Sequence, residues 1–413
     1  MRKVKASCLA LSFLLSGAGL VSAGQLIVTF SPSSQRSDRA FGIENIGGKV
    51  TRDLRLIEAL AVTVPDDIKT SAIYTVPGVV RVEEDRYSKW IEEVQTPLPL
   101  SHVSDNLGTA TEVYVPEASA PQPAEMRPTP EENEIPWGIK RVNAAGAWGF
   151  NSGKGVKVAI IDTGMDYTHP DLAAHYAGGY NAVNTSATPL DDHGHGTHVA
   201  GTIGALRDAK GVVGVAPEAQ LYAVKVLDAN GSGAYSNIIA GIQWAVENGI
   251  QVINMSLGGK SGTPALAEAM TAADKAGVTI VCAAGNDSGP VNYPAKYPES
   301  IAVAASDSAD KITSFSSRGA EIAFIAPGAK VYSTYKGGGY STLSGTSMAS
   351  PHVAGLAALA VASGAKTPAE VRATLKRAAS SMGLKPTEEG AGMIDAARIG
   401  ALMAAGENGS SSL

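Results

Sequence analysis

The chain has 413 residues, of which 44% are apolar and only 17% are charged, and its formal net charge is −6. This composition excludes a disordered polyelectrolyte, because such chains are rich in charge and poor in apolar residues. The negative charge also argues against a nucleic-acid-binding surface, which needs a basic face. At about 150 residues per domain, the length predicts two or three folding units with a large core.

The first 23 residues have the three parts of a secretory signal peptide. The start contains the basic residues Arg2, Lys3 and Lys5, residues 6–21 are apolar apart from Ser and Gly, and residues 21–23 offer a small-residue cleavage site. A membrane anchor is the alternative, but an anchor needs about 20 strongly apolar residues and two glycines interrupt this stretch. We therefore predict a secreted protein with no membrane attachment after cleavage. Because Cys8 is removed with the signal, Cys282 remains alone and no intramolecular disulfide can form.

The sequence of residues 24–90 indicates a small domain that begins with a strand at Gln25–Phe30. It is small for an independent core and is expected to depend on a partner. Residues 91–134 contain seven prolines, nine acidic residues and one basic residue, without apolar periodicity. They predict an extended acidic linker, with a binding motif as the alternative. Residues 403–413 predict a flexible Gly/Ser-rich tail.

From residue 135 to 402, continuous apolar runs alternate with helical segments. Predicted strands are Val156–Asp162, Leu221–Leu227, Val252–Met255, Val278–Ala283 and Ile301–Ala305, and predicted helices are Ser236–Glu247 and Pro264–Ala276. This alternation predicts an α/β fold, a doubly wound and mostly parallel sheet with helices on both faces. In such sheets the active site forms beyond the carboxyl ends of the strands. Asp162, Ser256 and Asn286 each follow a predicted strand.

Three segments carry the residues of nucleophilic catalysis: Asp162–Gly164, His193–Gly201 and Gly345–His352. A serine hydroxyl is a poor nucleophile until an imidazole takes its proton, and that imidazole needs a carboxylate to fix its tautomer. The sequence around Ser347 predicts a helix N-terminus, where the helix dipole favours developing negative charge.

Taken together, these segments resemble the subtilisin-type serine proteases. The resemblance runs from Ile135 to about Ile399 and includes the runs Gly214–Pro217, Tyr222–Leu227 and Ile253–Gly259. It implies a monomeric serine endopeptidase that cleaves proteins and peptides through an acyl-enzyme intermediate.

Carried over residue by residue, the resemblance implies that Asp162 orients the histidine, His195 is the general base and acid, and Ser347 is the nucleophile. Asn286 corresponds to the side-chain donor of the oxyanion hole, together with the backbone N–H of Ser347. The family's substrate-binding positions correspond to Ser256, Leu257, Gly258, Gly285 and Asn292. Asn292 stands where the family has a small residue at the base of the specificity pocket, which implies a shorter or more polar pocket.

Two other histidines and two aspartates surround the predicted base. In the family the base opens the run His-Gly-Thr-His, which selects His195; His198 is then a packed histidine and His193 a loop residue near the cleft. Asp191 and Asp192 either raise the local negative potential, lie near a cation or form a solvated turn.

Two other functional classes compete with this interpretation. The spacing His193-x-His195-x-x-His198 resembles the zinc-binding cluster of metallo-β-lactamases, but Thr197 takes the place of an aspartate ligand. A non-catalytic member of the fold is a second alternative, although no triad residue is missing.

The front domain resembles the subtilisin propeptide, a small α+β ferredoxin-like domain. The resemblance implies an intramolecular inhibitor and folding aid, with autocleavage between Ser88 and Glu93, near Trp90. An unrelated small domain is the alternative. More than forty residues separate this point from Ile135, which leaves the mature N-terminus open.

The resemblance also implies structural calcium, for which carboxylate and carbonyl oxygens are suitable ligands. Asp171 corresponds to the family's carboxylate ligand, and the matching loop spans residues 206–212. The implied ligands are Asp171, Asp208, Leu206, Lys210, Val212 and Asn133. The positive charges of Arg207 and Lys210 in this loop would weaken such a site.

Overall fold

The computed structural model describes residues 24–92, 94 and 134–401, which divide into two compact units. Of the described residues, one unit contains 24–53 together with 59–84, and the other contains 54–58 together with those from 85 onward. The predicted signal peptide, most of the predicted linker and the predicted tail lie outside the described residues. No helix in the described ranges is long and apolar enough to cross a membrane.

The smaller unit is a βαββαβ arrangement with the strand order β2-β3-β1-β4, as expected for a ferredoxin-like α+β domain. β1 pairs antiparallel with both β3 and β4, and the core includes Phe30, Ile43 and Ile73. Its elements are β1 (Gly24–Phe30), α1 (Arg36–Asn45), β2 (Lys49–Leu54), β3 (Ala59–Val64), α2 (Thr70–Ile73) and β4 (Val79–Glu84). The short helix η1 (Arg55–Ile57), between β2 and β3, belongs to the larger unit.

The larger unit contains a seven-stranded sheet with the order β13-β12-β11-β10-β6-β8-β7, and neighbouring strands pair in parallel. The strands are β6 (Lys157–Asp162), β7 (Tyr176–Asn181), β8 (Gln220–Lys225), β10 (Val252–Met255), β11 (Thr279–Ala283), β12 (Ser300–Ser306) and β13 (Ile322–Pro327). The predicted parallel α/β sheet is confirmed.

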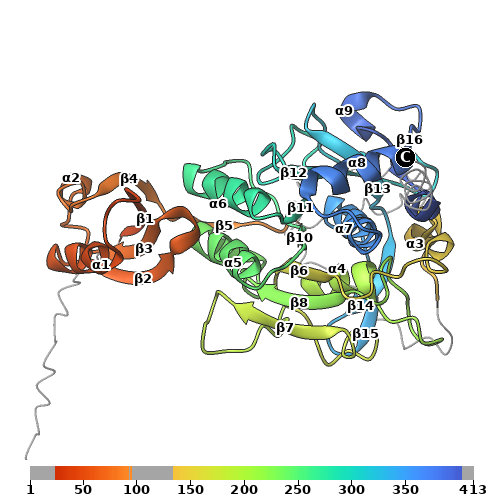
Figure 1. Cartoon of the computed structure of the whole chain (residues 1–413), viewed down its shortest axis with the longest axis horizontal. Helices are drawn as coiled ribbons and strands as arrows, with labels where there is room; N and C mark the ends of the chain where they lie inside the picture. Colours follow the sequence, from red (N-terminus) through yellow and green to blue (C-terminus); the bar gives the residue numbers. More distant parts are fainter. Residues whose placement is uncertain (1–23, 93, 95–133, 402–413) are drawn as a thin grey trace, which may run out of the picture. The chain divides into compact units, whose positions relative to one another are not determined.

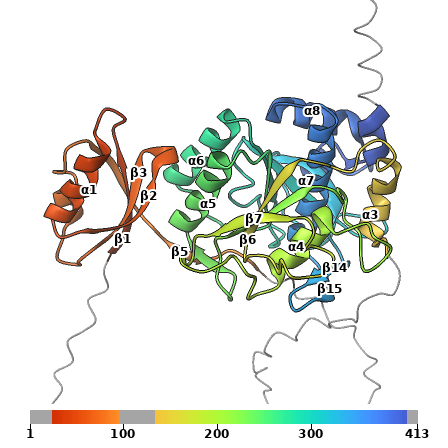
Figure 2. The same ribbon diagram turned by 60° about the horizontal axis from the view of Figure 1, so that its bottom comes forward.

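Helices cover both faces of this sheet. In Figures 1 and 2, α5 and α6 lie on one side of β6 and β10, while α4 and α7 lie on the other. α7 is buried along nearly its whole length, as its Ala- and Gly-rich sequence allows. The helices of this unit are α3 (Trp137–Arg141), η2 (Ala144–Gly146), α4 (His195–Gly204), α5 (Tyr235–Glu247), α6 (Pro264–Lys275), α7 (Thr346–Ala362), α8 (Pro368–Ala378) and α9 (Pro386–Glu389).

Short strands outside the main sheet complete the unit. They form the antiparallel pairs β14 with β15, β16 with β17, and β5 with β9. Their bounds are β5 (Tyr87–Lys89), β9 (Ser232–Ala234), β14 (Val331–Tyr335), β15 (Gly339–Leu343), β16 (Ala379–Ser380) and β17 (Met393–Ile394).

Because the main strands are parallel, their carboxyl ends meet at one edge of the sheet. β6 ends at Asp162, β10 leads into Ser256 and β11 leads into Asn286. Three residues that are far apart in the sequence therefore come from one edge, beside the first turns of α4 and α7.

Candidate active site

Asp162 and His195 form a buried hydrogen-bonded pair. Asp162 ends β6 and has no exposed surface, and its Oδ1 lies 2.8 Å from Nδ1 of His195, the first residue of α4. The same oxygen accepts the backbone N–H of Thr163 at 2.7 Å. A carboxylate at Nδ1 fixes the imidazole so that Nε2 is the ring atom able to exchange a proton with a reacting group.

Ser347 lies in the first turn of α7 and keeps 7% of its surface exposed. Its hydroxyl donates to the backbone oxygen of Ser256 at 3.1 Å. A hydroxyl has one hydrogen, so Ser347 must turn its O–H away from the Ser256 oxygen before it can donate to His195. Such catalytic hydrogen bonds often tighten only when substrate is bound. α4 and α7 pack against each other, and His195 and Ser347 lie in the first turns of these two helices.

Asn286 presents its amide nitrogen to the same pocket that Ser347 lines. Its Oδ1 accepts two hydrogen bonds from Thr346, from the backbone N–H at 2.8 Å and from the hydroxyl at 2.9 Å. These bonds turn Nδ2 away from Thr346, and Nδ2 lies 3.5 Å from the carbonyl oxygen of Glu92. Thr346 was not among the predicted site residues, although it lies next to the predicted nucleophile.

The segment that leads to Glu92 lies along the edges of this pocket in an extended conformation. β5 pairs antiparallel with β9, and beyond it the carbonyl oxygen of Trp90 accepts the N–H of Gly258 at 2.9 Å. The Trp90 indole donates to the Gly233 carbonyl oxygen at 2.8 Å and meets the Tyr235 ring edge-on. Backbone hydrogen bonds on both sides of an extended strand are the usual way in which a groove holds a peptide.

The predicted substrate-binding residues come together around this segment. Leu257, Gly258, Gly285 and Asn292 line the pocket with Glu92 and Ser347, and Ser256 lies beneath it, where its hydroxyl donates to the Ser347 carbonyl oxygen at 2.8 Å. Asn292 is 93% buried, since 7% of its surface is exposed. Its amide nitrogen lies so near Gly285 that a Cβ added there would be 2.5 Å away. A polar amide therefore forms part of the pocket wall, next to Gly285.

His198 and His193, the two other histidines near the predicted base, lie in different environments. His198 is fully buried with Nε2 at 3.1 Å from the Val331 carbonyl oxygen, and burial lowers its pKa to about 3, so it stays neutral. The ring of His193 lies 6.2 Å from that of His195, between centroids. Within the described ranges, no group of three or more His, Cys, Asp or Glu side chains is arranged so that it could hold a metal ion.

Of the three alternatives for Asp191, the structure excludes a solvated turn. Asp191 is buried, and its carboxylate accepts hydrogen bonds from the first residues around α4, including the N–H of Gly194 at 2.8 Å. Asp192 is half exposed and pairs with Lys225 at 2.7 Å. The two neighbouring aspartates thus have different environments, which residue type alone could not separate.

The predicted calcium ligands, except Asn133, lie within the described residues. Asp171 is buried, and its Oδ2 accepts the Val212 N–H at 2.8 Å and the Tyr340 hydroxyl at 2.9 Å. Burial raises the pKa of the Asp171 carboxyl, and the nearby charge of Asp208 raises it further. Leu206 donates its N–H to the Asp171 carbonyl oxygen at 2.9 Å, and Lys210 donates its own to Asp208.

Cys282 lies in β11 with no exposed surface, and burial raises the pKa of its thiol to about 12. The thiol is therefore protonated and inaccessible at neutral pH, which fits a packing role.

Comparison with known sequences identifies the family. The profile of the subtilase family matches residues 153–400. The chain belongs to the subtilase family. It is 40% identical over 350 residues to subtilisin amylosacchariticus from Bacillus subtilis subsp. amylosacchariticus, covering 83% of this chain and 80% of that protein. This subtilase is a serine endopeptidase that hydrolyses peptide bonds.

Two further relatives match shorter stretches of the chain at higher identity. Subtilisin Savinase from Lederbergia lenta is 47% identical over 268 residues, which cover 63% of this chain and 97% of the relative. Subtilisin DY from Bacillus licheniformis is 53% identical over 232 residues, which cover 54% of this chain and 84% of the relative.

Proposed function

We propose that this subtilase is a secreted, monomeric endopeptidase made as a self-processing, inhibited precursor, and that Asp162, His195 and Ser347 form its catalytic triad. The observation that carries the proposal is the buried Asp162–His195 pair beside a pocket lined by both Ser347 and Asn286. Its substrates are unfolded or flexible protein segments that can lie extended in the groove, as the segment ending at Glu92 does.

In the proposed reaction, Ser347 Oγ attacks the carbonyl carbon of the scissile bond while His195 Nε2 takes the hydroxyl proton. The carbonyl oxygen becomes negative and accepts hydrogen bonds from Asn286 Nδ2 and the Ser347 N–H. The C–N bond then breaks, and the leaving amine takes the proton from His195. Water then attacks the carbonyl carbon of the acyl-enzyme while His195 takes a proton from the water. The ester C–O bond breaks, and His195 returns the proton to Ser347 Oγ. Asp162 stabilises the imidazolium in both halves.

The triad assignment predicts that Ser347→Ala abolishes peptide hydrolysis and that Asn286→Ala lowers kcat by about 100- to 1000-fold. The wild type should lose activity to a fluorophosphonate, which labels Ser347, and should keep it during brief exposure to a chelator. Initial rates on a chromogenic peptide check both expectations. Cleavage that persists in Ser347→Ala at the wild-type rate would contradict the triad.

Self-processing at the bond after Glu92 is supported by the position of the Glu92 carbonyl oxygen, 3.5 Å from Asn286 Nδ2. The alignment with the Bacillus subtilis relative covers 83% of this chain, more than residues 153–400, so the likeness extends beyond the matched family region. A precursor segment that fills the groove would block substrates until it is cut and released, which is the basis of the proposed inhibition.

If processing occurs there, the first N-terminus produced by the active enzyme begins at Glu93, before any trimming of the following acidic residues. The Ser347→Ala precursor should keep its Glu92–Glu93 bond. N-terminal sequencing of both proteins during the first minutes after refolding measures this. A secreted active enzyme that begins at Gly24 would contradict self-processing.

A structural calcium ion is proposed at Asp171 and the loop 206–212. The residues fit it, because Oδ1 of Asp171 has no hydrogen-bond partner in the described ranges and Asp208 adds a second carboxylate nearby. The guanidinium of Arg207, one of the two positive charges in this loop, lies over the Trp148 ring, 5.0 Å from the ring centroid. The ion would neutralise the two carboxylates and tie the loop to Asp171.

Calcium should raise the unfolding midpoint of the Ser347→Ala protein, since a ligand at about 100 times its Kd stabilises the folded state by about 2.7 kcal/mol. Asp171→Ala should remove this response. Asp208→Asn, which keeps an oxygen at that position, should retain it. Thermal unfolding with calcium or with a chelator measures the effect, and equal midpoints in the two conditions would rule out the site.

The pocket beside Gly285 is proposed to select short or polar side chains, because the polar Asn292 amide forms part of its wall. Asn292→Gly should raise kcat/KM for a peptide with Phe before the scissile bond, relative to the same peptide with Ala, by about tenfold or more. Because both kcat/KM values are measured on the same enzyme sample, their ratio does not depend on the concentration of active enzyme. An unchanged ratio would show that Asn292 does not limit the pocket.

A further inference from the structure

The carboxylate of Asp191 is the centre of a buried hydrogen-bond network around the Asp162–His195 pair. Its Oδ1 accepts the N–H groups of His193 at 3.0 Å and Gly194 at 2.8 Å, and its Oδ2 accepts the Thr197 N–H at 2.9 Å. The first N–H groups of a helix have no partner within the helix. Asp191 therefore fixes the start of α4, where His195 is the first residue.

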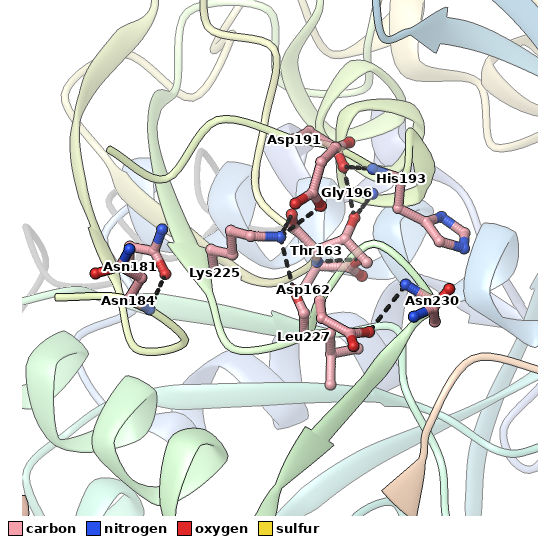
Figure 3. Close-up of polar contacts among 12 residues, drawn as sticks. Asp162, Thr163, Asn181, Asn184, Asp191, His193, Gly196, Lys225, Leu227 and Asn230 are labelled. Atoms are coloured by element: carbon pink, nitrogen blue, oxygen red, sulfur yellow. Dashed lines mark hydrogen bonds and ion pairs between the residues drawn. The ribbon is translucent and has the colours of Figure 1, made fainter. Parts of the chain in front are cut away.

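Two hydroxyl groups extend this network to the loop that follows β6. Thr163 donates its hydroxyl to Asp191 Oδ1 at 2.9 Å and accepts the Gly196 N–H at 3.0 Å. Thr197 donates its hydroxyl to Asp191 Oδ2 at 2.6 Å and accepts the Asp166 N–H at 2.9 Å. In Figure 3, dashed lines join the Thr163 hydroxyl to Asp191 and to Gly196, and Asp162 lies next to Thr163.

The other side of Thr163 is held by a buried lysine. Lys225 Nζ donates to the carbonyl oxygens of Thr163 and Leu227, each at 2.7 Å, and the three groups converge in Figure 3. Lys225 is also the partner of Asp162 in the β6–β8 register. Thr163 is thus fixed through both its backbone and its side chain, one residue after the proposed triad aspartate.

The loop after β6 and the start of α4 approach each other so closely that the residue after His195 has no room for a side chain. A Cβ added to Gly196 would lie 2.1 Å from the Gly164 carbonyl oxygen. The loop after β6 therefore approaches the first turn of α4 closely. This approach lies next in sequence to Asp162 and His195, whose side chains are joined by the 2.8 Å hydrogen bond.

We propose that Asp191 and Thr163 are positioning residues that hold the loop of Asp162 and the helix of His195 in register. This inference rests on the proposed triad. Asp191 fixes the start of α4, and Thr163 joins this start to the loop after β6. These hydrogen bonds set the distance between the Asp162 carboxylate and the His195 imidazole. Catalytic groups lose rate steeply when displaced, by about 100-fold for 1 Å.

The test removes the Thr163 hydroxyl without changing the size of the side chain. Thr163→Val should lower kcat by about 10- to 100-fold with little change in KM, because the substrate groove is untouched. Thr163→Ser restores the hydroxyl and should recover most of the lost rate. Thr188→Val, which removes a hydroxyl that accepts only from Tyr167 on the surface, is the matched control and should behave as the wild type.

A second measurement does not depend on activity or self-processing. In the Ser347→Ala background, the Nδ1 proton of His195 is observed by NMR. Adding Thr163→Val should speed its exchange with solvent and move its resonance upfield, while the Thr188→Val addition should leave both unchanged. If kcat and this resonance are both unchanged in folded Thr163→Val, the positioning role is wrong. Activity that persists in Ser347→Ala would instead overturn the triad itself.

Discussion

The site depends on a carboxylate that has been taken out of water. Asp162 has no exposed surface, and burying a charge is costly unless partners compensate for the lost hydration. One oxygen accepts from His195 and from Thr163, while Oδ2 has no hydrogen-bond partner in the part of the chain described. Such a carboxylate is stabilised most when the neighbouring imidazole becomes a cation. The cost of burial is therefore offset at the moment when the proposed reaction transfers the proton to His195.

The parallel sheet provides the place where this arrangement is possible. β6, β10 and β11 end at one edge of the sheet, and α4 and α7 begin beside that edge. Residues from these five elements are therefore brought together by the sheet itself. The substrate side of the site is also built from backbone. β9 and Gly258 present hydrogen-bonding groups on either side of the segment ending at Glu92, and these bonds recognise an extended chain of almost any sequence. In the proposed function, selection among substrates depends on side-chain pockets such as the one that Asn292 lines.

Much of this could be predicted from the sequence, because the signals are local. The apolar runs predicted β6, β8, β10 and β11 to within two residues, and the order Asp, His, Ser marked the triad candidates. The parts that could not be predicted depend on side-chain hydrogen bonds between distant segments. A motif does not reveal that Asp191 is buried while Asp192 is half exposed, that Thr346 turns the Asn286 amide, or that Tyr340 contacts Asp171. Each of these follows from tertiary packing.

The central claim is that Ser347 forms a covalent acyl-enzyme with the help of the buried Asp162–His195 pair. Rapid mixing of the processed enzyme with a slowly deacylated ester, followed by acid quenching and peptide mass spectrometry, tests it directly. The account predicts a burst of leaving group equal to the concentration of active enzyme, and an acyl group on the peptide that contains Ser347. Turnover without a burst and with no acylated peptide, or an acyl group on another residue, would contradict it.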